Sequence, residues 1–168
     1  TDFAGKGEIF INEKGNLVLE MGAELSGLHW KGDPLPKSNY EISLQAKRTL
    51  GSDFFCGLTF PFKESHATLI LGGWGGSLIG ISSLDDFDAS ENETGDAYVF
   101  EDNQWYDIKL RVTDEEFTVW IDEKSVIDCE VVGRKVAMRP GEIEMSIPLG
   151  LCTFATTAEF RLFQFHLL

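Results

Sequence analysis

Residues 105–112, read WYDIKLRV, decide the fold of this chain, because apolar and polar side chains alternate along them. A β-strand points successive side chains to opposite faces of its sheet, so this run would have one dry and one wet face. The dry face would hold Tyr106, Ile108, Leu110 and Val112. The wet face would hold Trp105, Asp107, Lys109 and Arg111. This pattern is typical of an antiparallel strand that covers a core.

Short runs with the same period continue on both sides, from residues 8–12 to residues 158–167. Turn-forming segments such as Asp33-Pro34-Leu35-Pro36 and Asp122-Glu123-Lys124 separate them. Longer segments lack helical spacing, and a short helical pattern fits only at residues 143–147. The sequence therefore predicts an all-β protein, with residues 1–168 forming one sandwich domain.

Two segments are apolar in both phases, residues 54–60 (FFCGLTF) and residues 160–167 (FRLFQFHL). A strand of this kind has no wet face. We therefore expect a loop, a partner or a ligand to cover its second face.

Charge and length exclude several functions. The chain has 168 residues, 28 acidic against 14 basic ones, and a formal net charge of −14. Such a surface repels polyanions, which argues against nucleic acid and anionic membranes as partners. Apolar runs also fall well short of the roughly 20 residues that span a bilayer, so we expect no membrane insertion by this segment.

Three cysteines, Cys56, Cys129 and Cys152, lie far apart within apolar runs. Buried free thiols are the expected state of such residues, and one disulfide with a leftover thiol is the alternative.

Several segments of the chain resemble a known family. Residues 105–112, followed by FTVWID at 117–122 and VID at 126–128, resemble the strand trio of concanavalin A-like domains. Residues 149–151 and 158–165 resemble the last strands of the 3-keto-disaccharide hydrolase-like branch, and residues 15–19 and 39–44 match its beginning. The resemblance covers nearly the whole chain.

The resemblance implies a two-sheet antiparallel jelly-roll sandwich of the concanavalin A-like lectin/glucanase type, with a concave face. It also implies a carbohydrate-related role outside the cytoplasm. This chain departs from the branch at Leu162-Phe163, where Asn-Ile is usual, and at Asp122-Glu123, where the hairpin usually carries Asn. The matching motifs consist of core and turn residues, so they support architecture more than chemistry.

The stretch GGWGGS at residues 72–77 places Trp74 between four glycines. Glycine in a strand often marks a site where a ligand approaches closely. Trp74 could therefore be an open platform on which a pyranose ring stacks. Alternatively, the glycines form tight turns and Trp74 fills the core.

The loop at residues 85–94 (DDFDASENET) is rich in carboxylates. If it were extended, Glu91 with Glu93, or Asp86 with Asp88, could form the carboxylate pair that glycoside hydrolysis needs. Calcium binding and a solvated acidic loop are the alternatives. An EF-hand pattern fails, because its sixth position is Glu91 instead of glycine.

Arg48 has the inward phase of its strand, and Asp53 follows across a turn. A structural ion pair is one interpretation of the two residues. In the other they take part in sugar chemistry, because cleavage of a 3-keto sugar needs one base and a group that polarises the ketone.

We therefore predict a domain that recognises or processes carbohydrate. Its alternatives are a catalytic 3-keto-glycoside hydrolase and a structural module of a larger envelope protein. The predicted ligand-binding residues are Trp74, Arg48, Asp53, Asp88, Glu91, Asn92 and Glu93. We expect no bound metal or cofactor, with calcium as the alternative, and a secreted, periplasmic or envelope location. The sequence begins at Thr1 instead of Met, which leaves room for adjacent domains.

Overall fold

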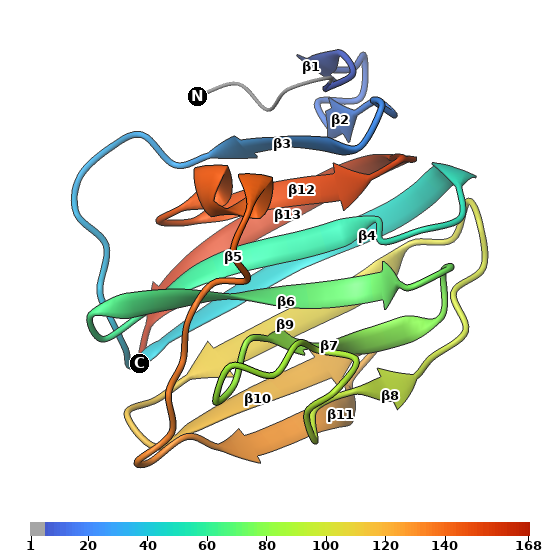
Figure 1. The fold of residues 1–168 in the computed structure, drawn as a ribbon. Coiled ribbons are helices and arrows are strands. Elements are labelled where there is room, and N and C mark those ends of the chain that lie inside the picture. The colour runs from blue at the N-terminus through green and yellow to red at the C-terminus, as the bar shows by residue number, and fades with distance from the viewer. Residues whose placement is uncertain (1–5) are drawn as a thin grey trace.

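A computed structural model describes residues 6–168 and contains two antiparallel β-sheets packed face to face (Figure 1). The seven-stranded sheet has the order β1-β2-β13-β4-β9-β10-β11. Its strands are β1 (Ile9–Ile11), β2 (Leu17–Leu19), β4 (Tyr40–Gly51), β9 (Tyr106–Val112), β10 (Glu116–Ile121), β11 (Lys124–Glu130) and β13 (Thr156–Leu167). This two-sheet architecture confirms the predicted jelly-roll sandwich.

The six-stranded sheet has the order β3-β12-β5-β6-β7-β8. Its strands are β3 (Leu25–His29), β5 (Cys56–Phe62), β6 (Ser65–Gly73), β7 (Leu78–Ser82), β8 (Asp96–Ala97) and β12 (Gly150–Phe154). One short 3₁₀ helix, η1 (Glu142–Ser146), precedes β12 and coincides with the place where a short helical pattern fitted the sequence.

The main core lies between the two sheets and follows the alternation of the strands. In β9 every second side chain is buried, as the pattern predicted. In β4 the buried side chains alternate with half-buried ones, and the buried positions begin at Tyr40 and end at Arg48. The outward positions of both strands therefore form the outer face of the seven-stranded sheet.

The outer face of the six-stranded sheet is covered by the chain itself. Every residue of β5 is buried, and a second small core forms over its outer side. This second core consists of Leu25, Phe54, Ile70, Met138, Ile143 and Cys152. The segment that leads through η1 supplies Met138 and Ile143, and it crosses the front of the sheet in Figure 1. A loop therefore covers the second face of the first two-sided apolar run, as expected.

The second two-sided apolar run, in β13, behaves differently. A register shift between Arg161 and Gln164 leaves one residue too many on β13, and Leu162 there has φ 56°. Leu162 and Phe163 are 65% and 41% exposed, so this part of the run is uncovered within residues 6–168. Phe165 instead stacks on Tyr40, with ring centroids 4.7 Å apart.

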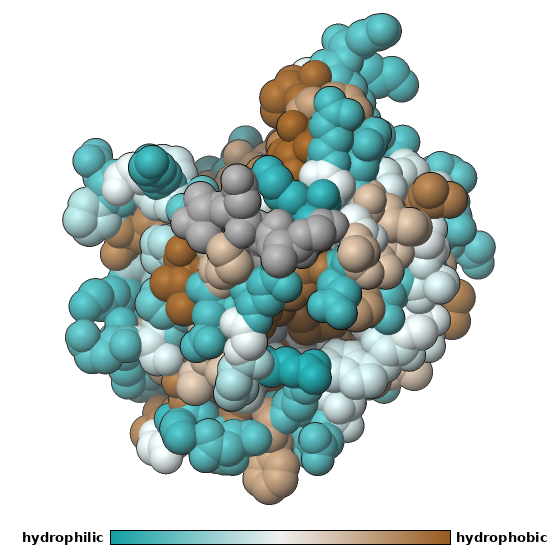
Figure 2. All heavy atoms as spheres, turned by 45° about the horizontal axis from the view of Figure 1, so that its top comes forward, coloured by the Kyte–Doolittle hydropathy of each residue, from teal (hydrophilic) through white to brown (hydrophobic). Residues whose placement is uncertain are grey.

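All three cysteines are free and buried, which confirms the first expectation. Burial raises the pKa of the Cys152 thiol to about 12. In residues 6–168 the longest helical element is far too short and polar to cross a membrane. Figure 2 shows a surface that is largely hydrophilic in that view, interrupted by smaller hydrophobic patches.

Candidate functional site

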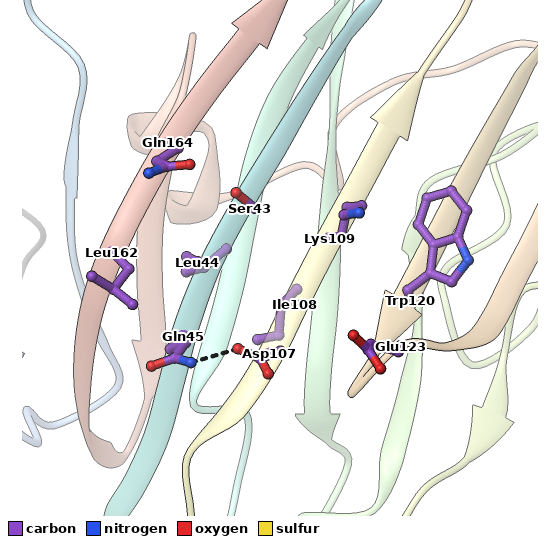
Figure 3. Close-up of a pocket in the computed structure, with 10 residues that line it drawn as sticks. All are labelled: Ser43, Leu44, Gln45, Asp107, Ile108, Lys109, Trp120, Glu123, Leu162 and Gln164. Carbon is purple, nitrogen blue, oxygen red and sulfur yellow. Dashed lines mark hydrogen bonds between the residues drawn. The ribbon is translucent and has the colours of Figure 1, made fainter.

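The outer face of the seven-stranded sheet contains a hollow of about 600 Å³. This volume lies within the roughly 300–1,000 Å³ of typical ligand pockets. Strands β13, β4, β9 and β10 and the turn after β10 supply its walls (Figure 3). The lining residues are Ser43, Leu44, Gln45, Asp107, Ile108, Lys109, Trp120, Glu123, Leu162 and Gln164.

A short hydrogen-bond chain fixes the floor of this hollow. The Gln45 amide donates to Asp107 Oδ1 at 2.5 Å, and its oxygen accepts from Arg161 Nε at 2.6 Å. Figure 3 shows the first of these bonds linking neighbouring strands β4 and β9. The side chains of Gln45 and Asp107 are therefore held in fixed orientations at the floor of the hollow.

Two tryptophans lie on the same sheet face, each beside cationic side chains. The Arg161 guanidinium carbon and Lys47 Nζ are 3.9 and 4.7 Å from the Trp105 ring centroid. Lys109 Nζ is 5.7 Å from the Trp120 ring, which lines the hollow. Such cation–π contacts hold an indole in place at modest energetic gain.

Sequence reasoning used these tryptophans as fold signatures and missed Trp120 as a candidate site residue. The signal was present, because Trp120 lies between the inward positions Val119 and Ile121 and so has the outward phase. A tryptophan in the wet phase of a strand is a better candidate for binding than for packing.

A second hollow, of about 370 Å³, lies beside Trp74 at the other sheet. Its wall comprises Glu24, Leu25, Asp53, Phe54, Trp74, Arg139, Pro140, Glu142, Ile143 and Phe154. Trp74 is 44% exposed, so it does not fill the core. The glycines do form a tight turn, since Gly76 N donates to Gly73 O and Gly75 has φ 88°. The tight turn expected of the glycines is therefore present, the core-filling role of Trp74 is wrong, and its role as a sugar platform stays a prediction.

Comparison with known proteins places the chain in a family. Residues 4–165 match the family described as the 3-keto-alpha-glucoside-1,2-lyase-like domain. The chain belongs to this family. No curated protein matches the sequence at a significant level.

Solved structures show the same fold in proteins with carbohydrate-related names. The carbohydrate binding module CBM66 from Bacillus subtilis has a TM-score of 0.58 at 14% identity, over 98% of this chain and 96% of that one. The family 7 alginate lyase A1-II′ has a TM-score of 0.57 at 10% identity, over 95% of this chain and 83% of that one. At these identities the likeness concerns the fold.

Within this family member, Arg48 is a structural residue by its contacts. It is 7% exposed, and its guanidinium donates to Asp102 Oδ1 at 2.8 Å and to the Phe100 carbonyl at 2.9 Å. The ion pair expected with Asp53 is therefore formed with Asp102, and only the Asp53 backbone carbonyl approaches Arg48, at 3.4 Å. The Asp53 side chain lies at the Trp74 hollow instead.

The loop at residues 85–94 is a series of turns and not an extended strand. Both Glu91 N and Asn92 N donate to Asp88 O, and Asn92 Nδ2 donates to Ile81 O at 2.8 Å. The loop packs on β7, where a Cβ at Gly80 would lie 2.9 Å from Ala89. The condition for the carboxylate pair Glu91 and Glu93, an extended loop, is therefore not met.

Carboxylates of this loop pair with nearby cations. Arg134 binds both Asp85 and Glu93, and its hydrogen bond to Glu93 lowers the Glu93 pKa to about 2. Asp88 accepts from Ser82 at 2.7 Å and pairs with Arg139 at 2.9 Å. The Arg139 guanidinium carbon also lies 5.9 Å from the Trp74 ring centroid, so its partner Asp88 is linked to the Trp74 hollow by Arg139. Glu91, in contrast, is exposed.

Residues 6–168 contain no group of three or more His, Cys, Asp or Glu side chains arranged to hold a metal ion. Calcium binding stays a prediction that these observations leave untested.

Proposed function

We propose that this domain binds a saccharide outside the cytoplasm, in the hollow on the outer face of the seven-stranded sheet. One observation carries the proposal. The six-stranded sheet has its outer face covered by the η1 segment, whereas the seven-stranded sheet carries a hollow lined by polar groups and an indole. Membership of the 3-keto-alpha-glucoside-1,2-lyase-like family supports the same ligand class.

The lining chemistry suits a sugar. A pyranose presents a face of C–H bonds that can stack on Trp120, while its hydroxyls need both donors and acceptors nearby. Asp107 supplies an acceptor, Lys109 a donor, and Gln164 both. A hollow that combines several polar groups with one aromatic wall binds such a ligand better than it binds a hydrocarbon.

Substitution of Trp120 tests this proposal. Isothermal titration calorimetry with a panel of neutral and acidic oligosaccharides should identify a ligand, and Trp120→Ala should weaken it about 30-fold, or about 2 kcal/mol, as for a central aromatic anchor. Trp30→Ala is the matched control, since Trp30 is exposed but lies outside this hollow. Equal affinity in wild type and Trp120→Ala would contradict the sheet-face site.

Turnover is the second candidate function, and the carboxylates Asp107 and Glu123 beside Lys109 favour it. In a 3-keto-glycoside the ketone acidifies the C2 proton. A carboxylate would take this proton while Lys109 polarises the ketone, the C1–O bond would break, and a C1=C2 bond would form. The aglycone would leave as its alcohol by taking a proton from the carboxylic acid so formed or from solvent.

The same panel, extended by a 3-keto-glucoside, separates the two functions. Release of the aglycone by wild type and not by Asp107→Asn would show catalysis, whereas binding without release would show recognition alone. A chain that neither binds nor cleaves any member would favour the structural-module alternative.

A further inference from the structure

We propose that the hollow beside Trp74 is a second saccharide site, which takes a pyranose unit that carries no negative charge. This site is formed by the ends of β3 and β12, the turns before β5 and after β6, and the η1 segment. None of its lining residues lines the sheet-face hollow. The inference therefore does not depend on the function proposed above.

The backbone presents the Trp74 indole as a platform. Trp74 and Gly75 are the central residues of a turn with φ 46° and 88°, the combination found in tight hairpin turns. Gly76 lets this turn approach the neighbouring loop, because a Cβ there would lie 2.8 Å from the Ser52 carbonyl oxygen. The turn is thus anchored on its inner side, and the ring is left 44% exposed.

Further aromatic surface lies in the same hollow. The rings of Phe54 and Phe154 have centroids 6.0 Å apart, and Phe154 is 37% exposed. Exposed aromatic side chains on one concave surface mark binding sites more often than packing. Phe54 itself is buried, so Phe154 and Trp74 offer the flat apolar surface to the C–H face of a sugar.

Hydrogen-bond acceptors dominate the polar part of this wall. Glu24, Asp53 and Glu142 all line it. Glu142 Oε1 is buried and has no hydrogen-bond partner among residues 6–168. A buried acceptor without a partner is costly, and a hydroxyl or ammonium donor of a ligand would relieve that cost.

The charge of the wall selects among sugars. Three carboxylates face one cation, Arg139, whose guanidinium is already paired with Asp88 at 2.9 Å. The wall therefore has an excess of negative charge, which repels a uronate and favours neutral or aminated sugars. An ammonium group would also be attracted by the face of the indole.

Indole N–H signals in two-dimensional ¹⁵N NMR spectra report on each site separately. The chain has four tryptophans, and their signals can be assigned with single Trp→Phe variants. The probes are cellotetraose, mannotetraose, a glucosamine tetramer and tetragalacturonate. We expect the Trp74 signal to move with the glucosamine tetramer or a neutral tetramer, and tetragalacturonate to bind at least tenfold more weakly.

Single-residue variants show which side chains are needed for sugar binding at this site. Trp74→Ala should abolish the binding, whereas Trp30→Phe should leave it unchanged, since Trp30 is similarly exposed at 46% but lies in neither hollow. Glu142→Gln should weaken the glucosamine tetramer at least threefold. Circular dichroism of each variant shows whether the fold is retained.

Two results would overturn the proposal. One is a Trp74 signal that stays in place with all four probes, and the other is tetragalacturonate binding as tightly as the uncharged sugars. Movement of the Trp120 signal alone would refute this second site and leave the sheet-face proposal standing. Movement of the Trp74 signal alone would support this second site and contradict binding in the sheet-face hollow.

Discussion

Arg48 places a full positive charge on the inner face of β4, near the end of the strand. Its guanidinium carbon also lies 5.7 Å from the Phe55 ring centroid. The backbone carbonyls of Phe100, Asp53 and Gly76 accept from its nitrogens, so the side chain ties three loops to one strand. One of these loops carries Trp74. The residue thus supports the turn that presents the indole without needing to touch a ligand.

Removal of this charge should destabilise the protein. Arg48→Met leaves buried carbonyl oxygens without donors, and we expect a loss of about 2–3 kcal/mol in the free energy of unfolding. Asp102→Asn is the matched control and should cost under about 1 kcal/mol, because the Asp102 side chain is 53% exposed. Urea unfolding measures both, and equal losses in the two variants would contradict this account of Arg48.

For Arg48 the sequence predicted that the side chain points inward, but it did not predict which carboxylate pairs with it. Alternation along residues 40–48 predicted that Arg48 points inward, and it does. Its partner Asp102 lies 54 residues away, beyond any local pattern, whereas Asp53 was near only in sequence. Trp74 was singled out by its glycines, yet the acceptors around it come from distant segments such as η1.

The η1 segment decides which sheet face stays open, because it covers the outer face of the six-stranded sheet. An apolar strand without a wet phase showed that β5 needed a cover, but the helical pattern at residues 143–147 was too short to show that this segment would supply it. The hydroxyl of Ser146 in η1 lies 2.6 Å from that of Thr59 in β5, so the cover is joined to the sheet by polar as well as apolar contacts.

Ile143 tests whether this cover is a packed layer. The side chain is 8% exposed within the second small core. Ile143→Ala should therefore lower the free energy of unfolding by about 2–3 kcal/mol, as a large-to-small change in a core does. Val132→Ala, at a position that is 68% exposed, should change it by less than about 0.5 kcal/mol. A near-neutral Ile143→Ala would mean that the segment merely lies on the sheet.

The whole molecule combines a formal charge of −14 with scattered ion pairs, so its carboxylates respond to acid in different ways. The Arg134 hydrogen bond lowers the Glu93 pKa to about 2. Burial alone would raise the Glu159 pKa, but bonds from Asn16, Asn12 and Lys47 lower it on balance. Repulsion by Asp128 instead raises the Glu116 pKa, so protonation there relieves strain between like charges.

Acid should therefore weaken the fold through Glu93 in a defined window. A carboxylate whose pKa is lowered on folding stabilises the protein above its unfolded pKa, about 4.5, and loses this contribution as the pH falls towards its folded pKa, about 2. The pair is largely exposed, so we expect its share of the loss to stay below about 1 kcal/mol. Thermal unfolding at pH 6 and pH 3 should show a smaller drop for Glu93→Gln than for wild type. An identical drop in both would mean that Arg134 holds the 85–94 loop without help from the Glu93 charge. Other carboxylates would then be responsible for the loss of stability at low pH.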